Sequence, residues 1–159
     1  MKEKVSYRPI TEQDRDFLYR IYTGTREKEM TLTGWSDEQK EEFLRMQFNL
    51  QHTQYLQNYR EGSFEIILVD ETPAGRLYLN RGKEEIRIID LELLADFRNR
   101  GIGSEIMNDL ITEANKKNLP LTLHVLHDNP AFKFYERLGF KIKEDKGMYL
   151  LIEKQPGKP

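Results

Sequence analysis

The sequence predicts an α/β fold of the α+β type, with a mixed central sheet of about seven strands and helices on both faces. Three observations predict it. Apolar runs of strand length recur along the chain, two capping boxes precede stretches of helical period, and the second half holds a strand–helix–strand unit. The predicted element order is β-α-α-β-β-β-α-β-α-β-β.

Two capping boxes predict the helices of the N-terminal part. Thr11 with Asp14 opens the first helix, and Ser36 with Gln39 opens a longer one. A short alternation of apolar and polar residues before them predicts a strand. The predicted ranges are a strand at 5–9, a helix at 11–22, a loop at 24–34 and a helix at 36–59.

Runs rich in Ile, Leu, Val, Phe and Tyr predict an antiparallel meander, with Pro73 and Gly82 between its strands. The predicted strands are 63–70, 74–80 and 85–94. A helix at 101–118 and a strand at 121–126 follow. Because a helix connects them, the strands at 85–94 and 121–126 are predicted to be parallel.

The C-terminal part predicts a short helix and a hairpin. Asn129 as N-cap and Pro130 at the first helical position start a helix that ends at Gly139. The hairpin has strands at 141–145 and 148–153 around Lys146-Gly147. The chain 1–159 is predicted to be a single domain whose residues 153–159 fray.

Composition excludes several classes of function. The 159 residues carry a net charge of -2, which draws the chain neither to nucleic acid nor to an anionic membrane. The sequence has no cysteine, and its three histidines lack metal-ligand spacing, so no metal is expected. No apolar run approaches the ~20 residues that span a bilayer, and the N-terminus lacks the apolar core of a signal peptide. We therefore expect a cytoplasmic protein.

A glycine-rich turn between the predicted strand 85–94 and the helix 101–118 is the most distinctive local feature. Backbone N–H groups at a helix N-terminus have no intrahelical partner, and the helix dipole favours an anion there. Gly101 and Gly103 allow close approach, and two arginines add positive charge. The alternative is that both glycines only permit a tight turn. The residues are Arg98, Asn99, Arg100, Gly101, Ile102, Gly103 and Ser104.

Two motifs carry a resemblance to a known family. Arg98-x-x-Gly101-x-Gly103 resembles the (Gln/Arg)-x-x-Gly-x-(Gly/Ala) acyl-CoA signature of the GNAT superfamily of acyl-CoA-dependent N-acyltransferases. The segment 129–140 resembles the second signature, Asn-x-x-Ala-x-x-x-Tyr-x-x-x-Gly-Phe. The clear resemblance covers residues 85–140. It implies the GNAT fold, with a sheet that splays between the strands ending near Leu94 and Leu126.

The resemblance implies acetyl-CoA as cosubstrate, with its diphosphate in the turn 98–104. The backbone of Leu93, Leu94 and Ala95 is then expected to bond the pantetheine arm as an added strand would. The N–H of Leu93 or Leu94 is a candidate to polarise the thioester carbonyl. Asn129 and Tyr135 are implied to contact the cofactor as well. The alternative for the strand end is that its side chains simply pack in the core.

Tyr135 corresponds to the family tyrosine whose hydroxyl lies near the CoA sulfur. A phenol can donate a proton or a hydrogen bond to the leaving thiolate. The alternative is an amphipathic tyrosine in an aromatic cluster.

The general base is sought among the acids of the strand 85–94. Alternation places Asp90 and Glu92 on one face of a buried strand, near the implied cofactor. Glu92 is the first choice and Asp90 the second, acting directly or through a water, and His124 is a third candidate. The alternative is a structural ion pair with one of three arginines, Arg76, Arg81 or Arg87.

A row of amides on the long helix points to the acceptor. Gln47, Gln51, Gln54 and Asn58 lie between two apolar stripes at helical spacing. Because the second helix borders the acceptor site in this family, Gln47 and Gln51, with Tyr55, are predicted to contact the acceptor. A solvated glutamine edge or a dimer contact is the alternative. Trp35 is interpreted as a staple or a lid.

The predicted function is acetyl transfer from acetyl-CoA to a primary amine by direct attack in a ternary complex. The acceptor is left open among a small amine, an amino acid, an antibiotic and a protein N-terminus, as is a homodimer. The alternative is a non-catalytic acyl-CoA sensor or regulatory module of the same fold. Thiol release across an amine panel distinguishes the two.

Overall fold

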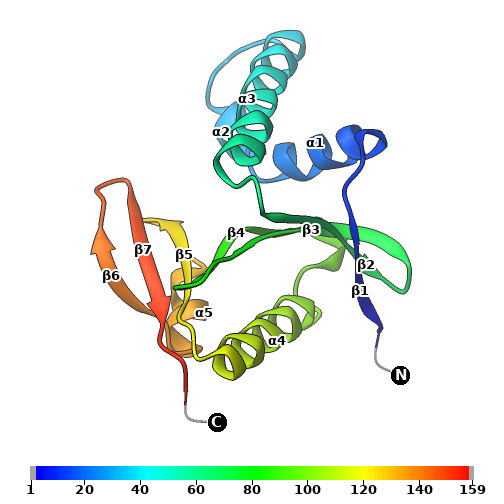
Figure 1. The fold of residues 1–159 in the computed structure, drawn as a ribbon. Helices are drawn as coiled ribbons and strands as arrows, with labels where there is room; N and C mark the ends of the chain where they lie inside the picture. Colours follow the sequence, from blue (N-terminus) through cyan, green and yellow to red (C-terminus); the bar gives the residue numbers. More distant parts are fainter. Residues whose placement is uncertain (1–2, 158–159) are drawn as a thin grey trace. The chain divides into compact units, whose positions relative to one another are not determined.

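A computed structural model describes residues 3–157. The fold is α/β, with a seven-stranded mixed sheet in the order β1-β2-β3-β4-β5-β7-β6 (Figure 1). The predicted α/β class and the seven predicted strands are confirmed. Within residues 3–157, no helix combines the length and the apolar composition of a transmembrane segment.

The chain divides into two compact units, and the single domain stays a prediction. One unit comprises Met1–Arg76 with Glu92–Arg98, and the other comprises Leu77–Leu91 with Asn99–Pro159. Strands β3 (Thr72–Arg81) and β4 (Ile86–Leu93) each contribute residues to both units.

The first unit contains the N-terminal strands and helices. Strand β1 pairs antiparallel with β2, with Val5 opposite Val69. Helices α1 and α3 are in contact, and α1 runs across the lower end of α3 in the view of Figure 1. Leu18, Ile21 and Phe48 of these helices are buried. The elements are β1 (Val5–Pro9), the 3-10 helix η1 (Glu12–Asp14), α1 (Arg15–Gly24), α2 (Glu27–Thr31), α3 (Asp37–Asn58) and β2 (Ser63–Val69).

Both capping boxes form as predicted. The Thr11 N–H donates to Asp14 Oδ2 at 2.7 Å, and the box opens η1, which leads into α1. At α3, the Gln39 N–H donates to Ser36 Oγ at 3.2 Å, and the Ser36 N–H donates to Gln39 Oε1 at 3.0 Å. Reciprocal bonds of this kind satisfy N–H groups that lack helical partners.

Two sequence predictions for this unit are wrong. The predicted loop at 24–34 contains helix α2, which buries Met30, while Arg26 stacks on Tyr22 with its guanidinium carbon 4.0 Å from the ring centroid. The turn between β2 and β3 falls at Asp70 and Glu71, both with positive φ, and not at Pro73, which lies inside β3.

The second unit contains the strand–helix–strand unit and the C-terminal hairpin. Strand β4 pairs parallel with β5 over Ile86–Ile88 against Leu121–Leu123, which confirms the predicted direction. Strand β7 lies between β5 and β6 and is antiparallel to both. The elements are α4 (Ile102–Lys117), β5 (Leu121–Leu126), α5 (Phe132–Arg137), β6 (Lys141–Asp145) and β7 (Tyr149–Lys154).

Two boundaries in this unit differ from the prediction. Helix α5 starts at Phe132, because the Asn129 Oδ1 accepts from the Ala131 N–H at 2.8 Å and forms a turn before the helix. Residues 153 and 154, predicted to fray, belong to β7 and pair with β5. The Gly157 N–H donates to Asn115 Oδ1 at 2.9 Å, while residues 158–159 of the predicted tail lie outside the described residues.

Candidate active site

The glycine-rich turn starts α4. Gly101 is the N-cap with φ 79°, and its carbonyl accepts from the Glu105 N–H at 3.0 Å. This is the first i to i+4 bond of the helix, so the N–H groups of the first turn have no such partner. Asn99 also has positive φ, at 59°. The backbone of the turn therefore presents donors at a helix N-terminus, where an anion is favoured.

The two glycines of the turn differ in what the chain needs from them. Gly101 has a left-handed backbone that disfavours any side chain, so the fold itself requires it. Gly103 is not among the glycines with positive φ, and a Cβ built on it meets no atom of the described residues within 4 Å. A tight turn thus explains Gly101 and leaves Gly103 unexplained. A glycine there leaves the backbone bare, so that a ligand could approach it closely.

Arg98 is tied to the end of β4. Its Nε donates to the backbone oxygen of Leu93 at 2.9 Å. Arg98 and Leu93, both predicted to bind the cofactor, are thus joined by a hydrogen bond that links the start of the turn to the end of the strand.

The amide of Leu94 is used within the sheet. Its N–H donates to the Ala74 oxygen at 2.8 Å. Of the two amides predicted to polarise a thioester, Leu93 is therefore the better candidate. Ala95 begins a short 3-10 helix, η2 (Ala95–Phe97), that leads away from the strand.

Glu92 has a buried cationic neighbour. Its Oε2 lies 3.6 Å from Nη2 of Arg76, whose side chain is 2% exposed, whereas the Glu92 side chain is 23% exposed. The same Nη2 donates to Gln51 Oε1 at 3.2 Å. A guanidinium buried this deeply must be compensated by polar partners, and Gln51 and Glu92 supply two of them.

The other two arginines that the sequence offered as partners of Glu92 have different carboxylates. Arg81 donates to both oxygens of Glu113, at 2.6 and 3.1 Å. Arg87 donates to Glu85 at 2.9 Å. The predicted structural alternative for Glu92 is thus realised with Arg76, while the second candidate base, Asp90, is half-buried.

His124 is fastened to Arg87. Arg87 donates to Thr122 Oγ1 at 2.7 Å, and its Nη1 lies 3.4 Å from His124 Nδ1. Because a guanidinium only donates, we assign Nδ1 as the acceptor and place the proton of the neutral ring on Nε2. Burial, followed by the charge of Arg87, lowers the pKa of His124. In this tautomer Nδ1 faces Arg87 and Nε2 carries the proton, so neither ring nitrogen offers a free lone pair to an acceptor amine.

Tyr135 lies on α5 in an aromatic cluster. Its ring meets Phe140 edge-on at 5.8 Å and Phe134 at 5.4 Å. Phe140 is buried, so the cluster fixes the tyrosine ring. Ala131, Tyr135, Gly139 and Phe140 keep the spacing of the second signature, whereas Asn129 lies one residue nearer to the alanine than that signature has it.

The predicted acceptor residues of α3 have separate environments. Gln51 accepts a hydrogen bond from Arg76. This bond was not predicted, either by the proposed acceptor contact or by the alternative of a solvated glutamine edge. Gln47 and Tyr55 are half-buried. Met46 and Leu50, which belong to one of the two apolar stripes beside the amide row, are exposed to solvent. Trp35 packs edge-on against Phe43, with ring centroids 5.2 Å apart, and its interpretation as a staple or a lid stays a prediction.

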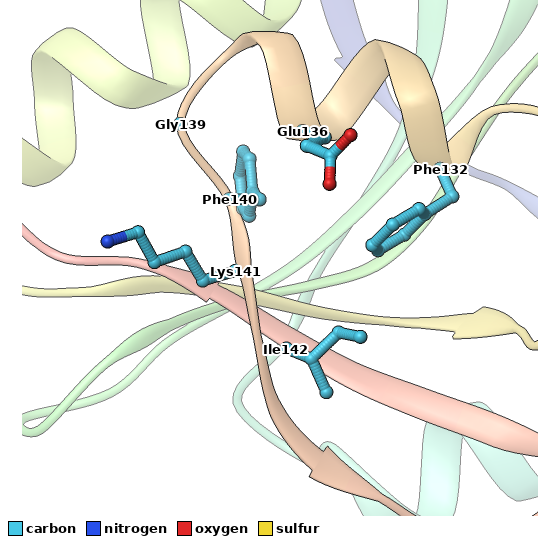
Figure 2. Close-up of a pocket in the computed structure, with 6 residues that line it drawn as sticks. All are labelled: Phe132, Glu136, Gly139, Phe140, Lys141 and Ile142. Atoms are coloured by element: carbon cyan, nitrogen blue, oxygen red, sulfur yellow. The ribbon is translucent and has the colours of Figure 1, made fainter.

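An open pocket of about 360 Å³ lies where α5 turns into β6. Figure 2 shows Phe132 and Glu136 on the helix, Phe140 below the turn, and Ile142 on the strand. None of the predicted site residues lines this pocket, so it lends no support to them.

From the sequence, Arg76 was named only as one of three possible partners of Glu92, and Gly75 was not identified. Arg76 lies in a run of apolar strand residues, and an arginine there is a signal of a buried ion pair. A Cβ on Gly75 would lie 2.2 Å from the Glu92 backbone oxygen, so the two strands approach too closely for any side chain at that position.

Comparison with known proteins identifies the family. The model of the acetyltransferase (GNAT) family matches residues 15–140. The chain therefore belongs to this family and is an acyltransferase. No curated protein is similar enough in sequence to count as a match.

Solved structures share the fold at low sequence identity. The PaiA N-acetyltransferase of Thermoplasma acidophilum, in complex with coenzyme A, is 19% identical with a TM-score of 0.68 over 96% of this chain and 99% of its own. A GNAT family acetyltransferase of Elizabethkingia anophelis with acetyl-CoA bound is 18% identical, with a TM-score of 0.60 over 97% and 99%. Naa50 of Arabidopsis thaliana, in complex with a bisubstrate analogue, is 19% identical, with a TM-score of 0.59 over 95% and 98%.

Proposed function

We propose that the protein transfers the acetyl group of acetyl-CoA to a primary amine by direct attack in a ternary complex. The observation that carries this proposal is Gly103, a glycine at a helix N-terminus that neither backbone strain nor packing requires. The backbone donors of the turn from Arg98 to Ser104 suit a diphosphate. The family match and the coenzyme-bound relatives support acetyl-CoA as the donor.

In the proposed reaction the acceptor first loses a proton, and its neutral amine nitrogen attacks the thioester carbonyl carbon. The carbon–sulfur bond breaks, and the second proton that the nitrogen loses ends on the sulfur of the coenzyme A thiol. The Glu92 carboxylate takes the proton of the ammonium group, directly or through a water. The Leu93 N–H stabilises the developing oxyanion. The Tyr135 phenol donates a proton or a hydrogen bond to the departing thiolate. The chain has no cysteine that could carry the acetyl group, which favours direct attack.

Asp90 is the second candidate base, and Asn129, Gln47 and Tyr55 remain proposals for cofactor and acceptor contacts. The acceptor class stays open among a small amine, an amino acid, an antibiotic and a protein N-terminus. Half-buried carboxylates on β4 favour an acceptor that arrives as a cation.

The proposal is tested by thiol release from acetyl-CoA across a panel of small amines, amino acids, amine-bearing antibiotics and peptides, with the acetylated product identified by mass spectrometry. Release that depends on one class of amine supports the transferase. Coenzyme A binding with no turnover on any amine supports the alternative, an acyl-CoA sensor. A protein that binds no coenzyme A contradicts both.

A further inference from the structure

We infer that Arg76 is a positioning residue that acts through Glu92. This inference rests on the proposed function, because it concerns the carboxylate that we propose as base. The guanidinium lies inside β3, 2% exposed, with Nη2 3.6 Å from Glu92 Oε2 and 3.2 Å from Gln51 Oε1. One buried cation thus joins the candidate base to the amide row of α3.

The burial of the two partners is unequal, and this sets their roles. Arg76 is sealed from solvent, while the Glu92 side chain keeps 23% of its surface. Any substrate that reaches this pair therefore meets the carboxylate and not the guanidinium. The charge of a buried guanidinium attracts the carboxylate beside it and restricts where that carboxylate lies. Arg76 thereby prepares Glu92 without touching the acceptor.

Consecutive residues of β3 hold both the backbone and the side chain of Glu92. The Gly75 backbone approaches the Glu92 oxygen so closely that a Cβ would lie 2.2 Å from it, and Arg76 follows with its guanidinium beside the carboxylate. The place of the carboxylate is thus determined from the neighbouring strand as well as from β4.

Gln51 makes α3 part of the same arrangement. Its Oε1 accepts from Arg76 across 25 residues of sequence, so the helix that we propose to border the acceptor also restrains the guanidinium. A change at Gln51 is therefore expected to reach the reaction through Arg76 and Glu92 rather than through contact with the acceptor.

The pair makes a single substitution at Glu92 ambiguous. Glu92→Gln removes negative charge from beside a buried guanidinium, which destabilises the fold whether or not Glu92 is a base. The double variant R76M/E92Q removes both charges and is expected to recover stability, since replacing both partners of a buried pair is often neutral.

The test is a cycle of four proteins: wild type, R76M, E92Q and R76M/E92Q. Melting temperature, coenzyme A affinity, and kcat and KM for the best acceptor are measured on each. We expect E92Q to melt several degrees lower and the double variant to regain most of that loss. R76M is expected to lower kcat at least tenfold with coenzyme A affinity nearly unchanged, and to have little further effect on kcat when Glu92 is already glutamine.

Two further variants keep the result decisive if R76M does not fold. R76K retains a charge and is expected to recover part of kcat, and Q51M is expected to lower kcat while leaving the acceptor KM nearly unchanged. An equal loss of kcat from R76M with and without Glu92, or no loss of kcat in R76M, overturns the positioning role. If R76M does not fold, an unchanged kcat in Q51M overturns it. Full activity in E92Q refutes Glu92 as base, while the melting temperatures still report whether the two residues are coupled.

Discussion

Arg76 and Glu92 form an ion pair in which only the carboxylate reaches the surface. Their atoms Nη2 and Oε2 lie 3.6 Å apart, on adjacent strands whose backbones leave no room for a side chain at Gly75. The sequence left two alternatives for Glu92, a catalytic base and a structural ion pair. The geometry makes these roles compatible, because a structural cation behind a half-buried carboxylate also orients it.

Gly103→Glu is expected to reduce coenzyme A affinity at least a hundredfold. The substitution puts bulk and negative charge where the diphosphate is proposed to meet the helix N-terminus. Isothermal titration measures the effect. Asn108→Glu is the matched control, because it adds the same charge at an exposed position of α4 and should leave affinity nearly unchanged. Unaltered affinity in the Gly103 variant would refute the diphosphate site.

Alanine at the two glycines of the turn should have opposite effects on stability. Gly101→Ala forces a Cβ into a left-handed backbone and costs about 1 kcal/mol. Gly103→Ala adds a methyl group in open space within a helix and should stabilise by roughly 0.5 kcal/mol, while weakening coenzyme A binding. Urea unfolding measures the stability of both variants, and a titration measures coenzyme A binding. A Gly103→Ala protein that binds coenzyme A like wild type would favour a purely structural turn.

Tyr135→Phe is expected to lower kcat by roughly ten- to a hundredfold while coenzyme A affinity changes less than threefold. The phenyl ring keeps its contacts with Phe134 and Phe140, so folding should be preserved. Steady-state kinetics and a binding titration separate the two effects. Tyr59→Phe, a phenol outside the predicted site, is the control. A kcat equal to that of wild type would remove Tyr135 from the chemistry.

Acid should unfold the protein partly through Asp14. Hydrogen bonds from Arg8, at 2.8 Å to each oxygen, lower the pKa of Asp14 from 3.8 to about 2. A lowered pKa in the folded state stabilises the fold above pH 4, and this contribution is lost as pH falls from about 4 to about 2. With the Arg8 side chain 39% exposed, we expect roughly 1 to 2 kcal/mol.

Urea unfolding of wild type and Asp14→Asn across that pH range checks this expectation. The difference in free energy of unfolding should be full at pH 7, should begin to fall near pH 4 and should be mostly lost by pH 2. A difference that stays constant down to pH 2 would show that the ion pair with Arg8 does not carry it.

The local elements of the fold were predictable because their causes are local. Each capping box acts over four residues, and the strand–helix–strand unit predicts parallel pairing of β4 and β5. The turn at Gly101 and Gly103 was predictable for the same reason. Where local signals competed, the prediction failed. Asn129 was predicted to cap α5, but its side chain forms a turn before that helix. The segment 24–34 was predicted to be a loop, but it contains helix α2, whose Met30 is buried.

The strands, the major helices, the family and the glycine turn could be predicted from the sequence, since each depends on residues close together in the chain. Three contacts became known from the folded chain alone: Arg76 is the arginine beside Glu92, the Leu94 N–H donates within the sheet, and Gln51 accepts from Arg76. These contacts depend on atoms brought together from distant parts of the chain. In a buried region of low dielectric constant, an ionic or polar interaction is strongest with the nearest partner. Which partner is nearest depends on the fold and not on spacing in the sequence.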